Sequence, residues 1–368
     1  MKITVSKDKL QEKLSDIQSI VEKKTTMQIL SHFMLSVTRD GVAISATDLE
    51  TAIREPLVAE KVDAEGSLCI PARKLFEIVR EVDGDISLTA DDSDWMKVKA
   101  GASNFRLACL DSEEFPKWPH MEEEQKMVLK AADLQHMIEK TLYSAGESDT
   151  RYTLNGILFH LVPSKNEYVV VGTDGHRLSA IFNTMDLPFK EEVKVIVPRK
   201  AASELRKFLG NGDEDISVLI GKNHIQFEIG EVKFLTRLIE GTYPNYDQVI
   251  PKGNEKKLTI NRESFIKALR RTSVMSREKS NAVKFDINDN LITVTASNPD
   301  LGEAKDQINV EYHGEELSLG FNARYLLDAL SAISSEEVEF ELQDSLSPTL
   351  LKEISSENYL CVVMPMRI

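Results

Sequence analysis

The stretch Val169-Val170-Val171-Gly172-Thr173-Asp174 decides how this chain is organised, because its pattern occurs three times. A hydrophobic run closes on Asp174, a residue type whose side chain readily bonds its own backbone in a turn. Residues 42–48 and 292–298 have the same form, and their turn residues lie 126 positions before and 124 positions after Asp174. Spacings of this size are typical of domains of about 100 to 150 residues and exceed solenoid repeats of about 20 to 50 residues.

Three further landmarks keep one order in every copy. A strand-like run feeds an amphipathic helix at residues 3–17, 127–138 and 258–269, where apolar residues recur at helical spacing. Pro or Asn, which suit the start of a helix, opens a second helix at Ile70-Pro71, Val197-Pro198 and Phe321-Asn322. Each copy ends on Phe115-Pro116, Tyr243-Pro244 or Met364-Pro365.

Polar stretches at residues 121–126 and 252–256 each follow a Pro and mark the boundaries between copies. We therefore expect three domains, at residues 1–121, 127–251 and 256–368. Each would hold two helices and many short alternating strands. Hairpin-length connections outnumber crossover-length ones, so the fold class is α+β with mostly antiparallel sheet.

Composition bounds the class of protein. Of the 368 residues 29% are charged, and the sequence has neither a long apolar run nor a basic-then-apolar leader, so we expect a soluble, cytoplasmic protein. Cys69, Cys109 and Cys361 form an odd set without metal-ligand spacing, and each lies in an apolar setting. They predict reduced, buried thiols and no metal or other cofactor.

Charge is distributed unevenly along the chain. The net charge of −15 argues against a nucleic-acid partner, but the six expected helix segments hold 20 Lys or Arg and only 12 Asp or Glu. These segments are residues 7–24, 71–82, 131–146, 198–209, 262–279 and 322–334. Helices that shared one surface would form a basic stripe on an acidic body. Such a stripe suits a phosphate backbone without reading of bases.

Catalytic motifs are missing from the sequence: there is no P-loop, dinucleotide fingerprint, zinc-protease helix or nucleophile elbow. The best enzyme candidate is the pair Asp174 and His176. Asp174 occupies the turn position of the other copies, so its first role is turn formation. Gly175-His176-Arg177 is interpreted as an insert of the second copy.

Five segments carry a resemblance that covers the whole chain. They are Arg151-Tyr152-Thr153-Leu154-Asn155-Gly156, Thr173-Asp174-Gly175-His176-Arg177-Leu178, Val197-Pro198-Arg199-Lys200, Tyr243-Pro244-Asn245-Tyr246 and Val363-Met364-Pro365-Met366-Arg367. In this order they resemble the bacterial DNA polymerase III beta subunit, the replicative sliding clamp. The resemblance implies a non-catalytic, ring-forming head-to-tail homodimer whose helices line a hole for double-stranded DNA.

The resemblance also implies partners and residues. The partners are the polymerase III alpha subunit, the clamp loader, other polymerases and repair proteins, all bound through short linear motifs. Their cleft maps to Leu154, Thr173, Gly175, His176, Arg177, Leu178, Pro244, Gln248, Val249, Leu346, Pro348, Val362, Val363, Met364, Pro365, Met366 and Arg367. Two of these residues depart from a common pattern of the family: Gln248 stands in place of an Arg, and Pro348 stands in place of a Ser.

DNA contacts carry over to Lys24, Arg73 and Tyr152. The helix pattern adds Arg80, Arg199, Lys200 and Arg270. Thr153 stands where some relatives have a second aromatic residue. Subunit contacts map to Phe105 and Leu107 in the first domain and to Val274 and Met275 in the third.

Two other classes of protein stay open on the residues alone. An enzyme that uses Asp174 and His176 would need a small-molecule pocket. An interaction scaffold that never touches DNA would leave the basic helix residues dispensable.

Overall fold

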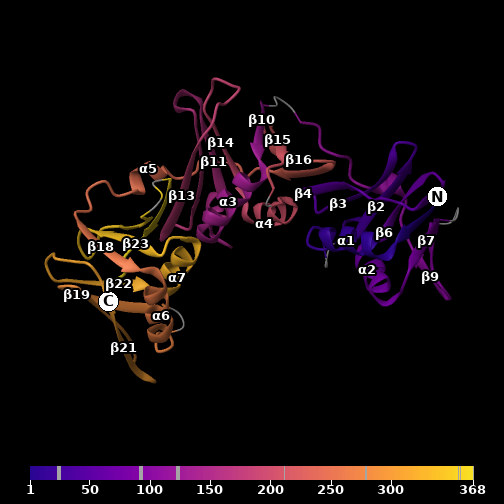
Figure 1. Ribbon diagram of the computed structural model, residues 1–368. Helices are drawn as coiled ribbons and strands as arrows, with labels where there is room; N and C mark the ends of the chain where they lie inside the picture. The colour runs from indigo at the N-terminus through magenta and orange to yellow at the C-terminus, as the bar shows by residue number, and fades with distance from the viewer. Residues whose placement is uncertain are drawn as a thin grey trace. The chain divides into compact units, whose positions relative to one another are not determined.

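The computed structural model describes residues 1–22, 26–90, 94–121, 125–210, 212–277, 280–354, 356 and 358–367. The chain divides into two compact units (Figure 1). Unit 1 comprises residues 1–134 and 203–238, and unit 2 comprises residues 135–202 and 239–368. The boundaries expected between three domains differ from these limits and stay a prediction. Within the described ranges, no helix is both long and apolar enough to cross a membrane.

Unit 1 contains two antiparallel sheets. The five-stranded sheet has the order β5 (Lys61–Ala64), β1 (Lys2–Ser6), β7 (Asp85–Ala90), β8 (Trp95–Ala100) and β9 (Ser103–Ala108). The eight-stranded sheet has the order β10 (Gln125–Lys130), β15 (Asp215–Ile220), β16 (His224–Ile229), β17 (Val232–Arg237), β4 (Thr51–Pro56), β3 (Gly41–Thr47), β2 (His32–Thr38) and β6 (Gly66–Pro71). The pairing of β17 with β4, with Leu235 opposite Ala52, joins strands of the first and second copies.

Unit 2 repeats this plan. Its eight-stranded sheet has the order β14 (Val193–Pro198), β11 (Gly156–Val162), β12 (Glu167–Thr173), β13 (Arg177–Thr184), β25 (Tyr359–Val363), β24 (Thr349–Glu353), β23 (Glu337–Leu342) and β18 (Lys256–Asn261). Its four-stranded sheet has the order β21 (Gly302–Asn309), β20 (Leu291–Asn298), β19 (Ala282–Asn288) and β22 (Leu317–Asn322). Here Leu178 of β13 lies opposite Val362 of β25, which joins the second and third copies.

The two eight-stranded sheets are the same assembly made twice. In each, the first strand and the last three strands of one copy form one half, and this half pairs edge to edge with four strands from the middle of the preceding copy. The five-stranded sheet corresponds to the half that contains β15, β16 and β17, and it ends on β9. The four-stranded sheet corresponds to the half that contains β11, β12 and β13, and it ends on β21. The threefold repeat and the α+β class with antiparallel sheets are confirmed.

All six expected helices are present. They are α1 (Lys7–Ile17), α2 (Ala72–Glu81), α3 (Ala131–Thr141), α4 (Arg199–Phe208), α6 (Arg262–Ser273) and α7 (Ala323–Ala332). Each buries its apolar stripe, as α1 does with Leu10, Leu14 and Ile17. Asn322 caps α7 by accepting a hydrogen bond from the backbone N–H of Arg324 at 2.9 Å.

Helix ends were predicted less well than helix positions. The segment expected to continue to residue 146 leaves the α-helix at Thr141 and continues as a 3₁₀ turn, η3 (Leu142–Ser144). The short helix α5 (Tyr246–Val249) was not expected, because four residues carry no helical period. Other 3₁₀ turns are η1 (Gln28–Ser31), η2 (Ser112–Glu114), η4 (Tyr152–Leu154) and η5 (Pro163–Lys165).

A buried ion pair ties the second copy to the third inside unit 2. Lys140 Nζ at the end of α3 lies 2.6 Å from Glu353 Oε1 on β24 and donates to the carbonyl of Ala332 at 2.6 Å. Glu353 also accepts the N–H of Ser334 at 2.8 Å. A buried pair stabilises only when further hydrogen bonds satisfy both charges, and here they do. The three cysteine thiols are buried, as the sequence predicts.

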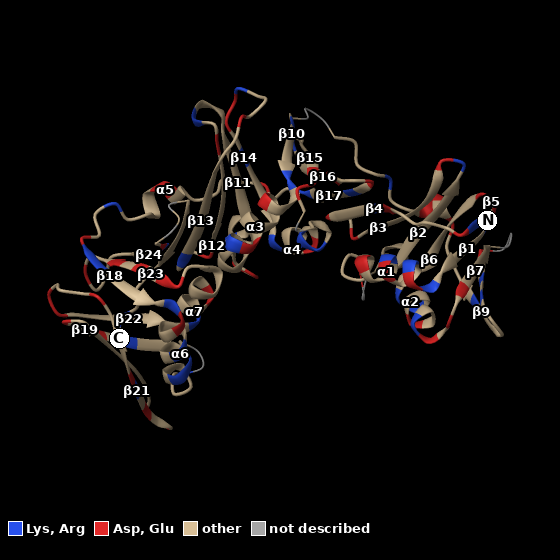
Figure 2. Cartoon of the chain, viewed as in Figure 1, with Lys and Arg blue, Asp and Glu red and all other residues tan. Residues whose placement is uncertain are grey.

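Lys and Arg outnumber Asp and Glu on α2, α4 and α6, whereas α1 carries three Lys beside three acidic residues (Figure 2). One of them, Lys13 of α1, reaches under its helix to Glu55 of β4, which is fully buried, with 3.0 Å between Lys13 Nζ and Glu55 Oε2. The pKa of Glu55 is raised to about 7, and burial is the largest cause. Lys13 lowers the pKa by less than burial raises it, and the carboxylates of Asp16 and Glu12 add to the rise. The Glu55 carboxylate is therefore an unfavourable charge near neutral pH.

Glu55→Gln is expected to stabilise unit 1 at pH 8 and to leave its stability nearly unchanged at pH 4.5. The folded-state pKa lies above the ordinary 4.5, so the stability that Glu55 contributes is fully present below pH 4.5 and is lost as pH rises through about 7. At pH 8 the variant should unfold with a free energy roughly 1 to 3 kcal/mol above that of the wild type, and at pH 4.5 with nearly the same. Urea unfolding at both pH values measures this difference. Equal gains at both would contradict the assignment.

Candidate functional site

The turn between β12 and β13 is fixed by its own side chains. Asp174 Oδ1 accepts the N–H groups of His176 and Arg177 at 2.9 and 3.0 Å, so the predicted turn role of Asp174 is confirmed. Thr173 Oγ1 donates to the carbonyl of Arg177 at 2.6 Å. Gly175 adopts φ 82°, the left-handed region that glycine enters most readily.

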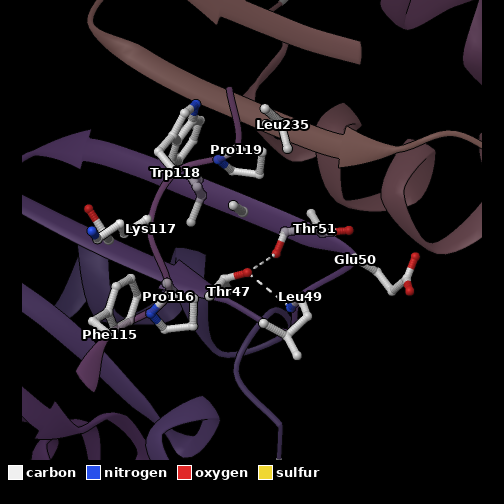
Figure 3. A pocket seen from close by; sticks show the side chains of 14 residues that line it. Thr47, Leu49, Glu50, Thr51, Phe115, Pro116, Lys117, Trp118, Pro119 and Leu235 are labelled. Atoms are coloured by element: carbon white, nitrogen blue, oxygen red, sulfur yellow. Dashed lines mark hydrogen bonds between the residues drawn. The ribbon is translucent and has the colours of Figure 1, made fainter. Parts of the chain in front are cut away.

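The interpretation of residues 175–177 as an insert of the second copy is wrong. The first copy has a turn of equal length between β3 and β4, in which Leu49, Glu50 and Thr51 take the corresponding places (Figure 3). The two turns differ in every one of these side chains, which hides their likeness in the sequence. Only the hydrogen-bonded register reveals it.

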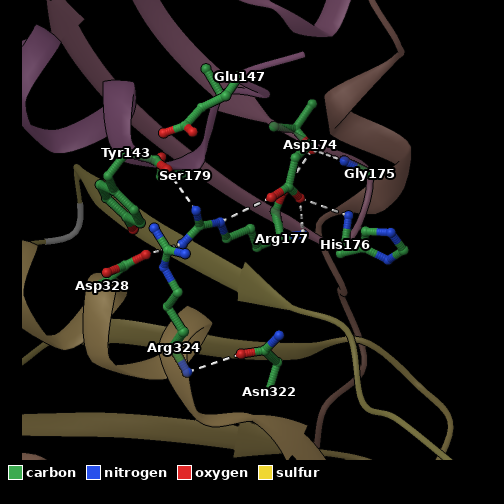
Figure 4. Close-up of polar contacts among 12 residues, drawn as sticks. Tyr143, Glu147, Asp174, Gly175, His176, Arg177, Ser179, Asn322, Arg324 and Asp328 are labelled. Carbon is green, nitrogen blue, oxygen red and sulfur yellow. Dashed lines mark hydrogen bonds and ion pairs between the residues drawn. The ribbon is translucent and has the colours of Figure 1, made fainter. Parts of the chain in front are cut away.

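Arg177 is held on all sides in unit 2 (Figure 4). Its guanidinium donates to Asp174 Oδ2 at 3.1 Å, to Asp328 Oδ2 at 2.5 Å and to the carbonyl of Tyr143 at 2.8 Å. It also lies over the ring of Tyr325, 4.6 Å from the centroid. Burial alone would lower the pKa of Arg177, but the two carboxylates raise it, so the residue is a fixed cation.

An apolar cavity of about 130 Å³ lies beside this turn. Leu154, Leu178 and Val362 are at most 2% exposed and belong to the buried cluster beneath it. The complete lining is Arg151, Leu154, Thr173, Gly175, His176, Arg177, Leu178, Pro244, Tyr246, Val249, Val362 and Met364. Ten of the residues expected in the cleft therefore line one pocket, and all of them belong to unit 2.

Seven other expected residues do not line this cavity: Gln248, Leu346, Pro348, Val363, Pro365, Met366 and Arg367. Val363 is buried but alternates with Val362 along β25, so its side chain leaves the sheet on the other face. Leu346 is 60% exposed in a loop whose backbone Asp344 holds. Met366 donates its N–H to the carbonyl of Gly320 at 2.8 Å, which anchors the end of the chain to β22.

Two lining residues, Arg151 and Tyr246, are absent from the expected set. Arg151 donates to Asp149 Oδ2 at 2.7 Å and to the carbonyl of Asp174 at 2.9 Å, and this pairing lowers the pKa of Asp149 to about 2. A Cβ at Gly175 would lie 2.6 Å from Arg151 Nη1, so a larger residue at this position would require that guanidinium to move. Both missed residues occur in the segments that carry the resemblance, which was the available signal.

The hydroxyl group of Tyr246 is held by a chain of polar side chains. This hydroxyl lies 2.7 Å from Nδ1 of the buried His160, whose Nε2 is 2.7 Å from Glu192 Oε1. Burial lowers the pKa of His160, so a neutral imidazole bridges the two groups. The pocket is thus mostly apolar, with a wall held by hydrogen bonds, and this arrangement suits an apolar side chain of a ligand. Among the described residues, no cluster suited to holding a metal ion is found.

Comparison with known proteins covers the chain from end to end. The DNA polymerase III beta subunit models match in three parts: the N-terminal domain at residues 1–119, the central domain at 128–245 and the C-terminal domain at 247–367. The chain belongs to the DNA polymerase III beta subunit family. Beta sliding clamps of Pseudomonas aeruginosa and Escherichia coli K12 are each 32% identical to it over 100% of both chains.

Solved sliding clamps have the same fold as this clamp. The Pseudomonas aeruginosa DNA polymerase sliding clamp matches it with a TM-score of 0.94 and 32% identity over 100% of both chains. The sliding clamp of Bartonella birtlesii, solved bound to griselimycin, matches with a TM-score of 0.93 and 35% identity over 100% of both. Sliding clamps are non-catalytic processivity factors that tether a polymerase to DNA. The expectation that the chain is not an enzyme is therefore confirmed through its family.

The residues expected to contact DNA differ in their surroundings in the clamp. Arg73, Arg80, Lys200 and Arg270 are exposed on α2, α4 and α6, and Tyr152 is 77% exposed. Lys24 lies outside the described residues. Arg199 differs from the others: its Nη1 donates to the carbonyls of Leu142 and Ala145, both at 2.6 Å, and burial lowers its pKa. Its guanidinium closes the end of η3, so a structural role explains it better than a DNA contact.

The residues expected between subunits lie on or beside the free sheet edges of the clamp. Phe105, 37% exposed, and Leu107, 8% exposed, belong to β9. Val274 is 75% exposed just past the end of α6. A Cβ built at Gly302, the first residue of β21, would lie 3.5 Å from Met275 Cε, which places Met275 against that edge.

Proposed function

We propose that two copies of this clamp join head to tail and close a ring around double-stranded DNA in the cytoplasm. The observation that carries the proposal is the pair of incomplete sheets. Each unit contains one eight-stranded sheet made of two joined halves. Each unit also contains one smaller sheet that corresponds to a single half: the sheet that ends on β9 in unit 1 and the sheet that ends on β21 in unit 2. A second chain supplies the missing half for each, and two such junctions close the assembly.

The strand pairings at the two internal junctions predict which residues face each other where β9 of one chain pairs with β21 of the other. Leu235 opposes Ala52 in unit 1, and Val362 opposes Leu178 in unit 2. The hairpins β8–β9 and β16–β17 both turn on two residues, so Arg106 corresponds to Leu235. Ser297-Asn298 corresponds in sequence to Thr47-Asp48, and Glu303 lies opposite Ser297 as Ala52 lies opposite Thr47. Arg106 of one chain therefore faces Glu303 of the other, a favourable cross-strand pair.

Apolar residues reinforce this edge. Phe105 on β9 and Val274 past α6 are large exposed hydrophobic side chains, and Met275 adjoins the start of β21. Contacts between these residues would add a small apolar core to the main-chain pairing. Interfaces with a buried apolar centre and a paired strand are stable enough for a permanent dimer.

The basic helices provide the DNA surface in this proposal. Arg73, Arg80, Lys200 and Arg270 expose their side chains on the element type that carries the excess of Lys and Arg, and Tyr152 adds an exposed aromatic ring. Contacts of this kind reach phosphates and carry no sequence information. They hold the duplex without fixing the position of the ring, so the closed ring supplies processivity through its topology.

The unit 2 pocket is the proposed docking site for partners. A Leu or Phe side chain of a short linear motif fits an apolar cavity of about 130 Å³. The partners proposed for this site are the polymerase III alpha subunit, the clamp loader, other polymerases and repair proteins. Leu346 and Arg367, which lie outside the cavity, would contact flanking residues of the motif.

Charge exchange across the proposed junction is expected to be reciprocal. Arg106→Glu and Glu303→Arg should each weaken the dimer, by roughly three- to ten-fold, because two like charges then oppose each other, whereas the double variant should recover most of the loss. Sedimentation over a range of concentrations measures the monomer–dimer equilibrium, with the wild-type dimer at about twice 41.4 kDa. Additive losses in the double variant would contradict the register.

A closed ring is expected to depend on the topology of its DNA. The clamp, loaded on nicked circular DNA in moderate salt, should stay bound, and it should leave once a restriction enzyme linearises the circle. Gel filtration of labelled clamp before and after cutting measures retention. Retention on linear DNA with free ends would show that affinity and not encirclement holds the protein, and the ring would be wrong.

Removing the end of the chain is expected to separate partner binding from assembly. Deletion of residues 364–368 takes Met364 from the pocket wall, and a fluorescent clamp-binding peptide should bind at least about ten-fold more weakly. Met364→Ala gives the same test while it keeps the Met366 link to β22. Dimer mass should not change in either variant. Unchanged peptide affinity in both would refute the docking site.

A further inference from the structure

Unit 1 holds a second pocket built on the same frame (Figure 3). Its cavity measures about 60 Å³ and is lined by the turn between β3 and β4, residues 115–119 and Leu235 of β17. These are the counterparts of the turn between β12 and β13, residues 244–249 and Val362 of β25 in unit 2. Internal repetition has therefore made the proposed docking pocket twice in one chain.

The two turns share the same hydrogen bonds. Thr47 Oγ1 donates to the carbonyl of Thr51 at 2.9 Å and accepts the N–H of Leu49 at 3.0 Å, as Thr173 does in unit 2. Asp48 Oδ1 accepts the N–H groups of Glu50 and Thr51, as Asp174 does for the corresponding residues. Leu49 takes φ 74° where Gly175 takes φ 82°.

The opposite wall is also repeated. Trp118 follows Pro116 by two positions, as Tyr246 follows Pro244. Each aromatic side chain is held by its polar atom: Trp118 Nε1 donates to Gln226 Oε1 at 3.0 Å. The floor is the pair of Leu235 and Ala52, which face each other across the strand junction. The hydrogen bond that fixes the indole of Trp118 and the cross-strand pair at the floor both define the walls of this pocket.

Size and charge distinguish the two pockets. The cavity is about half as large, 60 Å³ against 130 Å³, so it accepts a smaller side chain. Glu50 stands where unit 2 has His176, and Thr51 where it has Arg177. Lys117 lines the side of the pocket away from Glu50 in Figure 3. One acid and one base on opposite sides complement a ligand with a base and an acid on either side of its anchor.

We propose that the unit 1 pocket is a second binding site, for a short linear peptide that inserts a Val-sized aliphatic side chain between one basic and one acidic neighbour. Leu49, 51% exposed, and Trp118, 36% exposed, supply the apolar surface that this side chain covers. The basic neighbour pairs with Glu50 and the acidic one with Lys117. The proposal rests on the proposed function in one respect: it assumes that the unit 2 pocket binds a peptide and that the unit 1 pocket, which has the same turn and strand junction, does so in the same way.

Trp118 provides the signal for the test. The chain has two tryptophans, Trp95 and Trp118, so Trp95→Phe leaves one reporter on the pocket wall. The probes are acetyl-Gly-Lys-Val-Glu-Gly-amide and its reverse-charge order, acetyl-Gly-Glu-Val-Lys-Gly-amide, each titrated to millimolar concentration. At least one should change Trp118 emission saturably, and replacement of its Val by Ser should weaken binding by about ten-fold or more. No saturable change with either probe would overturn the proposal.

Variants locate the response. Glu50→Lys, at an exposed position, should weaken the bound probe by about two- to five-fold, whereas Glu81→Lys on the exposed face of α2 should not. Ala52→Leu fills the floor and should abolish the response. A response unchanged by both pocket variants would refute the site. Met364→Ala should leave it intact, so failure here is separate from failure of the unit 2 docking site, which its own fluorescent peptide reports.

Discussion

Main-chain pairing between the edge strands of successive copies is the constraint on which the rest of this structure depends. An open strand edge exposes unpaired N–H and C=O groups, and a chain with three copies of one domain has such edges at every boundary. The β17–β4 and β13–β25 pairings satisfy two of these boundaries and create the eight-stranded sheets. β9 and β21 remain outer strands of their sheets, and in the proposed ring a second molecule pairs with them. Architecture, assembly and the place of both pockets follow from this one interaction.

Because backbone atoms make these junctions, the side chains around them are free to differ. The turns at residues 47–52 and 173–178 keep their hydrogen bonds with Leu49 in place of Gly175 and Glu50 in place of His176. The main chain thus sets the position of each pocket, whereas side chains set its size and charge. This division explains how relatives with 32% identity keep a TM-score of 0.94.

Local features of the fold could be predicted from the sequence, and contacts between distant segments could not. The six helices, the Asp174 turn and the Asn322 cap depend on neighbouring residues, so periodicity and side-chain type were sufficient. Edge pairing between copies leaves no mark on either strand alone. Arg199 was grouped with basic surface residues because nothing near it in sequence shows that the carbonyls of Leu142 and Ala145 accept its hydrogen bonds. In the pocket, the resemblance placed ten lining residues; its segments also contain Arg151, but only the contact with Asp174 shows that Arg151 lies at the cavity.

The fixed surroundings of Arg177 have a consequence for the traffic of partners. Two carboxylates, a carbonyl and an aromatic face hold this side chain before any ligand arrives. A cavity that needs no rearrangement gives its ligands similar arrival rates, so the occupants differ chiefly in how long they remain. At the proposed docking site, exchange would therefore be timed by departure: each bound partner would stay for its own residence time, and the next would enter a pocket that is already formed.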